Sequence, residues 1–238
     1  MERIDTPKTV LEVSQLSKEV TSPEGLLTIL NQVDLKVSSG ESIAVVGVSG
    51  AGKSTLLGLL AGLDVPSSGH VLLNGQDLSR LDEDGRAELR AGHVGFVFQS
   101  FHLIPSLTAL ENVMLPLELG GHASARKSAM DTLDKVGLTP RAAHYPHQLS
   151  GGEKQRVAIA RAFAVSPEVL FADEPTGNLD HRTGKTIIEL LFRMNRETGT
   201  TLVLVTHDLS LAQQCDRIFH MHDGRITHVE EGSKGTGS

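Results

Sequence analysis

The sequence predicts an α/β fold with a largely parallel sheet, and three observations lead to that prediction. Short β-rich runs alternate with helical patterns along most of the 238 residues, as in parallel sheets covered by helices. A glycine-rich turn joins one of these runs directly to a helical pattern. Between two of the runs, residues 100–155 contain few β-branched stretches and indicate an inserted group of helices.

Four apolar runs predict the buried strands of this sheet. They occupy residues 42–46, 94–98, 169–172 and 201–206. Residues of the types found in binding and catalytic sites follow the four runs. In chain order these are a glycine loop from Gly47, then Gln99, the pair Asp173 and Glu174, and His207. Because ligands bind outside the carboxyl ends of parallel strands, we expect the functional site there.

The alternation of patterns predicts one domain over residues 9–230. Its core is expected at about 9–99 and 156–230, and a helical subdomain at about 100–155. Residues 231–238 are rich in Gly and Ser and are expected to form a disordered tail.

Capping signals support the helical insertion. Thr108 and Glu111 have the Thr-x-x-Glu spacing of a capping box. A further helix is predicted over residues 124–136, with Gly137 at its end.

Composition excludes several classes of protein. The net charge of −7 and the low aromatic content of 3% disfavour a nucleic-acid partner, which usually needs a basic excess or stacking rings. Cys215 is the single cysteine, so a reducing compartment is expected. No signal peptide is apparent, and the longest nearly apolar run, 56–63, is too short to cross a bilayer. We therefore expect a cytoplasmic protein.

The turn after the first run has the pattern Gly-x-x-x-x-Gly-Lys-Ser over residues 47–54. Its glycines let the backbone approach phosphates, and its N–H groups and the following helix N-terminus attract the anion. Lys53 adds a full charge toward the outer phosphates, and the Ser54 hydroxyl can bind Mg²⁺. An ordinary glycine-rich turn is the alternative, which the strand before and the helix after disfavour. The pattern predicts a nucleoside triphosphate with Mg²⁺, without separating a transporter from a kinase or GTPase.

Asp173 and Glu174 follow an apolar run directly. The first acid can hold the Mg²⁺ shell, and the second can orient and deprotonate water, which contributes on the order of 10²–10⁴-fold in rate. A solvated acidic loop is the alternative. Two adjacent acids in a chain that already holds the phosphate loop favour the catalytic interpretation.

A second glycine turn, Ser150-Gly151-Gly152-Glu153, opens a predicted helix over residues 153–164. Ser150 and Glu153 have the spacing of a capping box. Capping does not explain two successive glycines, which weaken a helix. They would leave N–H groups open to an external anion, so we expect a capped helix whose start also faces a phosphate.

That phosphate is expected to belong to a second chain. The Lys53 loop and Glu174 would already surround one side of the chain's own γ-phosphate. Two chains arranged head to tail would then form two identical composite sites around a twofold axis.

These elements together resemble the ATP-binding cassette (ABC) transporter ATPases from about residue 10 to 228. The matching motifs occur in the family's order: Walker A at 47–55, the Q-loop at Gln99, the signature at 149–156, Walker B at 169–174, the D-loop at 177–180 and the switch histidine at His207. The resemblance implies a RecA-like P-loop NTPase core, an antiparallel β portion near the N-terminus and an inserted α-helical subdomain.

The resemblance also implies a role for each motif residue. ATP would contact Gly47, Ser49, Gly50, Ala51, Gly52, Lys53, Ser54, Thr55 and Val20, together with Ser150, Gly151, Gly152 and Asp180. Mg²⁺ would be held by Ser54, Gln99 and Asp173, and catalysis would fall to Glu174, His207 and Gln99. Alone, His207 would suggest a surface histidine at a strand end and Asp180 a helix cap.

One position departs from the family pattern. Members usually place an aromatic ring under the adenine, and alignment puts Val20 there. Valine offers apolar contact without stacking, so we expect modest base selectivity, with comparable binding of GTP and ATP.

Residues 96–105 and 172–180 resemble the lipoprotein-releasing and macrolide-efflux branch (the LolD/MacB group). Within that branch, residues 81–83, 87–90 and 93–96 most resemble the YbbA-type ATPases. That branch implies an ATP-driven homodimer on the cytoplasmic face of the inner membrane. A separate permease would contact Phe101–Leu107, and a periplasmic or soluble accessory protein could join the complex. The implied task is export, extraction or force transmission.

Three alternatives compete with this prediction. A soluble ABC ATPase without a permease usually carries a second cassette, a coiled coil or zinc-binding cysteines, and this chain carries none of them. A small-molecule kinase would lack the turn at Ser150. A non-hydrolysing cassette would lack residues such as Lys53 or Glu174.

Overall fold

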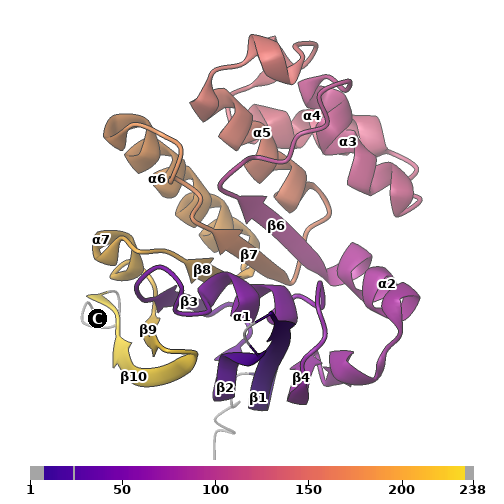
Figure 1. Cartoon of the computed structure of the whole chain (residues 1–238). Helices are drawn as coiled ribbons and strands as arrows, with labels where there is room; N and C mark the ends of the chain where they lie inside the picture. The colour runs from indigo at the N-terminus through magenta and orange to yellow at the C-terminus, as the bar shows by residue number, and fades with distance from the viewer. Residues whose placement is uncertain (1–7, 24, 234–238) are drawn as a thin grey trace, which may run out of the picture. The chain divides into compact units, whose positions relative to one another are not determined.

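A computed structural model describes residues 8–23 and 25–233, which form two compact units. The first unit contains the described residues up to Ala87 and from Thr201 onward, and the second runs from Glu88 to Thr200. The first unit holds β1 (Thr9–Ser22), β2 (Gly25–Ser38), β3 (Ser42–Val46), α1 (Lys53–Leu60), β4 (Ser68–Leu73), β5 (Gln76–Asp77), β8 (Thr201–Val205), α7 (Leu209–Ala212), β9 (Arg217–His222) and β10 (Arg225–Glu231). The second holds β6 (Val94–Phe98), α3 (Ala109–Leu119), α4 (Ala125–Lys135), α5 (Gly151–Ala164), β7 (Val169–Asp173) and α6 (His181–Thr198), and α2 (Glu83–His93) spans the boundary in sequence (Figure 1).

Two β layers build the first unit. Strands β2, β1, β4 and β5 pair antiparallel in that order, which confirms the antiparallel portion near the N-terminus. Strand β3 pairs parallel with β8 on one side and β9 on the other, and β10 closes that edge antiparallel to β9. The predicted strands at 42–46 and 201–206 are therefore confirmed, the second ending at Val205.

Burial explains why these two runs form central strands. Every residue of β3 and of β8 is buried, as expected for parallel strands covered on both faces. Helix α1 contacts β8, β2 and β4, and buries four leucines of its short length. The loop between β3 and α1 is thus fixed at both ends.

A parallel pair and a group of helices form the second unit. Strands β6 and β7 pair in register from Val94↔Val169 to Phe98↔Asp173, so both predicted strands are confirmed. Helices α3, α4 and α5 pack on one another, and α5 also packs on β6 and α6 (Figure 1). The Thr108–Glu111 capping box starts α3 as predicted, and the helix predicted at 124–136 is α4.

The chain end is only partly described. Glu231 is the last residue of β10, and the next two amides donate hydrogen bonds, Gly232 to Asp216 and Ser233 to Gln213. The other five residues of the predicted tail, 234–238, lie outside the described residues. Among the helices of the described chain, none has the length and apolar character needed to cross a bilayer.

Candidate nucleotide-binding and catalytic site

The glycine loop between β3 and α1 has a backbone that other residues adopt with difficulty. Gly50 and Gly52 have φ angles of 83° and 95°. A Cβ on Gly52 would lie 2.8 Å from Leu30 Cδ2 and 2.9 Å from the Ile29 carbonyl oxygen. The loop therefore turns tightly against β2, in the cradle form that suits a phosphate chain.

Lys53 is held inside this loop. Its Nζ donates to the carbonyl oxygens of Gly47 at 2.8 Å and Val48 at 3.1 Å. An ammonium has three N–H donors, so a third can serve a phosphate oxygen. At the N-cap of α1, Gly52 offers no side-chain acceptor to the first-turn amides, which suits them to an anion. The residues fit a bound triphosphate, and Ser54 and Thr55 follow in the first turn.

Val20 lies on the hairpin that adjoins the loop. It pairs across the strands with Leu27, whose side chain is 54% exposed. Two and three residues further along β2, Ile29 and Leu30 approach Gly52. Sequence reasoning missed Leu27, because only strand register places it opposite Val20. An apolar pair, rather than a ring, therefore lies on the two strands of which β2 reaches the phosphate loop.

His207 follows β8 and is exposed. Its neighbour Asp208 starts α7 by accepting hydrogen bonds from the Ser210 amide and hydroxyl at 2.8 and 2.6 Å. The Ser210 hydroxyl hydrogen bond holds the pKa of Asp208 below its ordinary value. This cap fixes the turn that carries His207 at the strand end.

Glu174 has the strained backbone that functional sites often show. It follows β7 directly, and its φ is 45°, in the left-handed region. Such a conformation costs about 1–3 kcal/mol for a residue other than glycine. Pro175 restricts it further, because the residue before a proline has fewer accessible conformations. The Gly177 amide donates to the Glu174 carbonyl at 3.0 Å and closes the turn.

Gln99 is tied to the segment after Glu174. Its Nε2 donates to Asn178 Oδ1 at 3.3 Å, and Asn178 Nδ2 donates back to the Gln99 carbonyl at 3.0 Å. A Cβ on Gly177 would lie 2.7 Å from Gln99 Nε2, so the glycine permits this contact. The structure thus brings together the loops after β6 and β7. Sequence reasoning assigned no such role to Asn178.

Sequence reasoning also assigned no separate role to Gln155. Its side chain is 0% exposed, and Nε2 donates to the Pro175 carbonyl at 2.7 Å. A weaker contact reaches the Phe98 carbonyl at 3.5 Å. Within the described residues, Gln155 Oε1 accepts no hydrogen bond. A buried polar atom without a partner lowers the free energy of unfolding by about 1–3 kcal/mol, so the Oε1 atom of Gln155 destabilises the fold.

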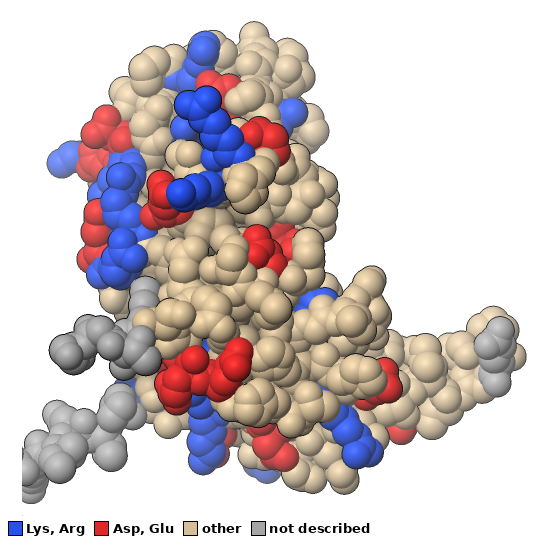
Figure 2. Space-filling view, turned by 90° about the vertical axis from the view of Figure 1, so that its left-hand side faces the viewer, with Lys and Arg blue, Asp and Glu red and all other residues tan. Residues whose placement is uncertain are grey.

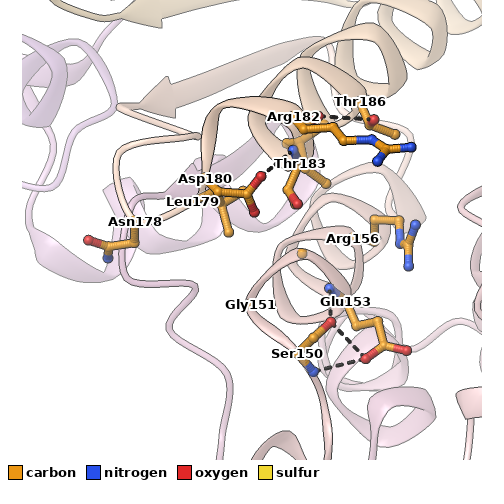
Figure 3. Close-up of a pocket in the computed structure, with 12 residues that line it drawn as sticks. Ser150, Gly151, Glu153, Arg156, Asn178, Leu179, Asp180, Arg182, Thr183 and Thr186 are labelled. Atoms are coloured by element: carbon orange, nitrogen blue, oxygen red, sulfur yellow. Dashed lines mark hydrogen bonds between the residues drawn. The ribbon is translucent and has the colours of Figure 1, made fainter.

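The predicted capping box at the second glycine turn is confirmed (Figure 3). Ser150 Oγ accepts from the Glu153 amide, and Glu153 Oε2 accepts from both the Ser150 amide and hydroxyl at 2.8 Å. The Ser150 amide hydrogen bond lowers the pKa of Glu153 below its ordinary value, so this carboxylate stays ionised to lower pH than a free glutamate. Arg141 Nε lies 3.2 Å from Glu153 Oε1 and balances its charge.

Close packing explains why Gly151 and Gly152 are glycines, which the capping box does not explain. A Cβ on Gly152 would lie 2.6 Å from Thr183 Cγ2, and one on Gly151 would lie 3.2 Å from Leu179 Cδ2. Both contacts come from the start of α6 and the segment before it. Helix α5, capped by Ser150, begins at Gly151, two residues before the predicted start, and the two glycines let its first turn lie close against α6.

Gly152→Ala tests this packing. Overpacking costs about 1–3 kcal/mol, and the helix gains back up to about 1 kcal/mol from alanine. We expect a net loss of about 1 kcal/mol in the free energy of unfolding, measured in urea. Thr183→Ser removes Cγ2, so the double variant should regain most of that loss. An additive double variant would contradict the contact.

Asp180 is the N-cap of α6, which is the role that its position would suggest without the family resemblance. Its side chain accepts from the Thr183 amide at 3.0 Å, and Thr183 holds the pKa of Asp180 below its ordinary value. Both helix starts border one pocket of about 460 Å³. Arg156 and Arg182 extend along the same side of it (Figure 3). An anionic ligand would meet positive charge there.

A second cavity, of about 310 Å³, lies beside the segment predicted to contact a permease. Phe96, Phe98 and His102 line it as a stacked series, with ring centroids 5.4 and 4.7 Å apart. Arg161 donates to the carbonyls of Phe101 and His102 at 3.0 and 2.5 Å. Those two residues have φ angles of 62° and 47°, so Arg161 holds a strained turn. Of the predicted Phe101–Leu107 contact segment, only His102 lines the cavity.

Comparison with known sequences gives consistent matches. A family model described as ABC transporter matches residues 30–177. An uncharacterized ABC transporter ATP-binding protein, YbbA of Escherichia coli K12, is 59% identical over 219 residues, covering 91% of this chain and 96% of that protein. The lipoprotein-releasing system ATP-binding protein LolD of Syntrophotalea carbinolica is 50% identical over 220 residues, covering 92% of this chain and 97% of that protein.

Solved structures give the same picture. A dimeric ATP-binding cassette in a post-hydrolysis state, bound to ADP and Pi, superposes with a TM-score of 0.86 at 40% identity. The match covers 93% of this chain and 98% of that one. A dimeric bacterial ABC transporter cassette has the same TM-score at 41% identity.

Proposed function

Because the chain belongs to the ABC transporter family, we propose that it is the ATPase subunit of an export or extraction complex, in which two copies close on ATP and move a membrane permease. The comparisons confirm three predictions made from the sequence: the P-loop NTPase fold, ATP with Mg²⁺ as cofactor, and ATPase activity. The observation that carries the mechanism is the capped glycine turn at Ser150, which borders the same pocket as Asp180.

Each predicted residue has a task in this proposal. Lys53 and the loop amides hold the outer phosphates, while Ser54, Gln99 and Asp173 are the residues suited to bind Mg²⁺. Bound Mg²⁺ would neutralise phosphate charge. Glu174 accepts a proton from water and orients it for attack.

The partner chain completes each site. The turn at Ser150 supplies N–H groups to the γ-phosphate of the other chain, and Arg156 and Arg182 add positive charge at the rim of the same pocket. Asp180 lies at the interface between the chains, and His207 contacts the γ-phosphate from its own chain. Closure therefore requires two bound nucleotides.

Base recognition follows from Val20. An aliphatic contact does not stack, so half-saturating concentrations of ATP and GTP should agree within about threefold. Val20→Tyr should tighten binding of both by about tenfold, because base stacking contributes about 1–3 kcal/mol. Val20→Ile is the matched control and should leave binding unchanged. Strong discrimination between the two nucleotides by the unaltered protein would contradict this assignment.

The permease partner is expected at the cavity beside His102. A cavity lined by stacked rings, with a strained turn at its edge, suits an apolar segment of another chain. We place the complex on the cytoplasmic face of the inner membrane, with Phe101–Leu107 as the rim of the contact. A periplasmic or soluble accessory protein would complete it.

Co-purification tests the coupling. The chain, tagged and expressed at its natural level, should be recovered from detergent-solubilised membranes with an integral membrane protein. A photoreactive residue at His102 should cross-link to that protein, and one at exposed Arg193 should not. Recovery of the chain without any membrane partner would contradict the proposal and favour a soluble ABC ATPase.

Charge disfavours a soluble ABC ATPase that acts on nucleic acid. The net charge is −7. On the face drawn in Figure 2, basic and acidic side chains of the described residues lie interspersed rather than gathered into one basic surface. Binding to a phosphate backbone would need such a surface.

A further inference from the structure

Gln155 joins three of the predicted motifs within the second unit. It lies in the first half of α5, the helix that Ser150 begins. Its Nε2 donates to the Pro175 carbonyl at 2.7 Å and approaches the Phe98 carbonyl at 3.5 Å. These two carbonyls belong to the neighbours of Glu174 and Gln99 in sequence. One amide therefore links α5 to the loops at the ends of two paired strands.

The cost of this side chain indicates that the link matters. Gln155 is 0% exposed, and its Oε1 accepts no hydrogen bond from the described residues. Methionine has a similar length and would fill the same space without leaving a polar atom unpaired. The Gln155 amide thus contributes little to the net stability of the fold. Its effect is to fix the position of the Pro175 carbonyl.

That position bears directly on Glu174. The strained φ of 45° persists only if its surroundings hold the turn in place. On one side, the Gly177 amide closes the turn, and Asn178 fastens it to Gln99. On the other side, Gln155 holds the residue that follows Glu174.

We propose that Gln155 is a positioning residue for hydrolysis, which sets the carboxylate of Glu174 according to the position of α5. The proposal rests on the proposed function, because Ser150 at the start of α5 contacts the partner chain's nucleotide in the closed dimer. When that contact moves α5, the amide of Gln155 moves the Pro175 carbonyl and Glu174 with it. Water activation in one chain then depends on the nucleotide bound by the other.

Gln155→Met tests the proposal, since it keeps the length of the side chain and removes both donors. We expect kcat to fall by about tenfold or more, as for a lost transition-state contact. Half-saturating ATP and ATP-dependent dimerisation should stay within about twofold of the unaltered protein. The urea midpoint should change little, because the loss of the unpaired Oε1 offsets the loss of the donor to the Pro175 carbonyl. A merely structural role predicts the opposite: a lower midpoint and an unchanged kcat.

Ile159→Met is the matched control, as it places the same side chain at another buried position of α5 and should keep kcat. Hydrogen exchange on the unaltered protein gives a readout that needs no variant. The amides of Glu174 and of residues 176–178 should become more protected when ATP drives dimerisation. A wild-type kcat in Gln155→Met, or no change in exchange at these amides, would overturn the proposal. Failure of the unaltered protein to dimerise or hydrolyse ATP would instead overturn the proposed function.

Discussion

Glu174→Gln should reduce steady-state ATP hydrolysis by about 100-fold or more while ATP still binds. Glutamine keeps the size of the side chain, but its amide does not accept a proton from water. Loss of general-base catalysis lowers the rate by a factor of the order of 10²–10⁴. Because closure no longer ends in hydrolysis, ATP-bound dimers should accumulate. Turnover and sedimentation with Mg·ATP measure both effects.

A control separates chemistry from loss of charge. Glu189→Gln removes a carboxylate from the exposed face of α6 in the same unit and should leave turnover unchanged. Turnover of Glu174→Gln near that of the unaltered protein would remove Glu174 as the base. The strained backbone at this position would then need another explanation.

Ser150→Arg should remove nearly all hydrolysis and leave nucleotide affinity of the Lys53 loop within about twofold of the unaltered protein. The long side chain would fill the pocket that Ser150, Gly151 and Asp180 border, so the partner's nucleotide could not approach. Turnover should fall by about 100-fold, and ATP should no longer drive dimerisation. Equilibrium binding of a labelled nucleotide reports the Lys53 loop alone.

The capping role of Ser150 needs its own control, because its loss costs about 1 kcal/mol. Thr108 forms the same capping box with Glu111 at the start of α3. Thr108→Arg should therefore lower stability by a similar amount and keep hydrolysis. Equal loss of activity in both variants would mean that Ser150 acts only as a helix cap.

Much of the fold could be predicted from local sequence. The runs at 42–46 and 94–98 are strands over those residues, because strands buried on both faces are continuous apolar segments with polar or glycine ends. Both capping boxes have the predicted partners, since each depends on residues only three positions apart.

Contacts between distant segments could not be predicted in this way. Gln155 is a polar residue on a helix, and nothing local indicates that its amide reaches Pro175. Helix α5 has two glycines in its first turn, against helix propensity, and a Cβ on Gly152 would collide with Thr183 of another helix. Likewise, the pairing of Val20 with Leu27 depends on strand register.

The dependence of hydrolysis on protein concentration tests the composite site most directly. Specific ATPase activity should be measured across a dilution series, with sedimentation in Mg·ATP giving the fraction of dimer at each concentration. If each centre takes its halves from two chains, activity per chain should fall in proportion to the dimer fraction and vanish where only monomer remains. Constant activity per chain in a wholly monomeric sample would contradict the account.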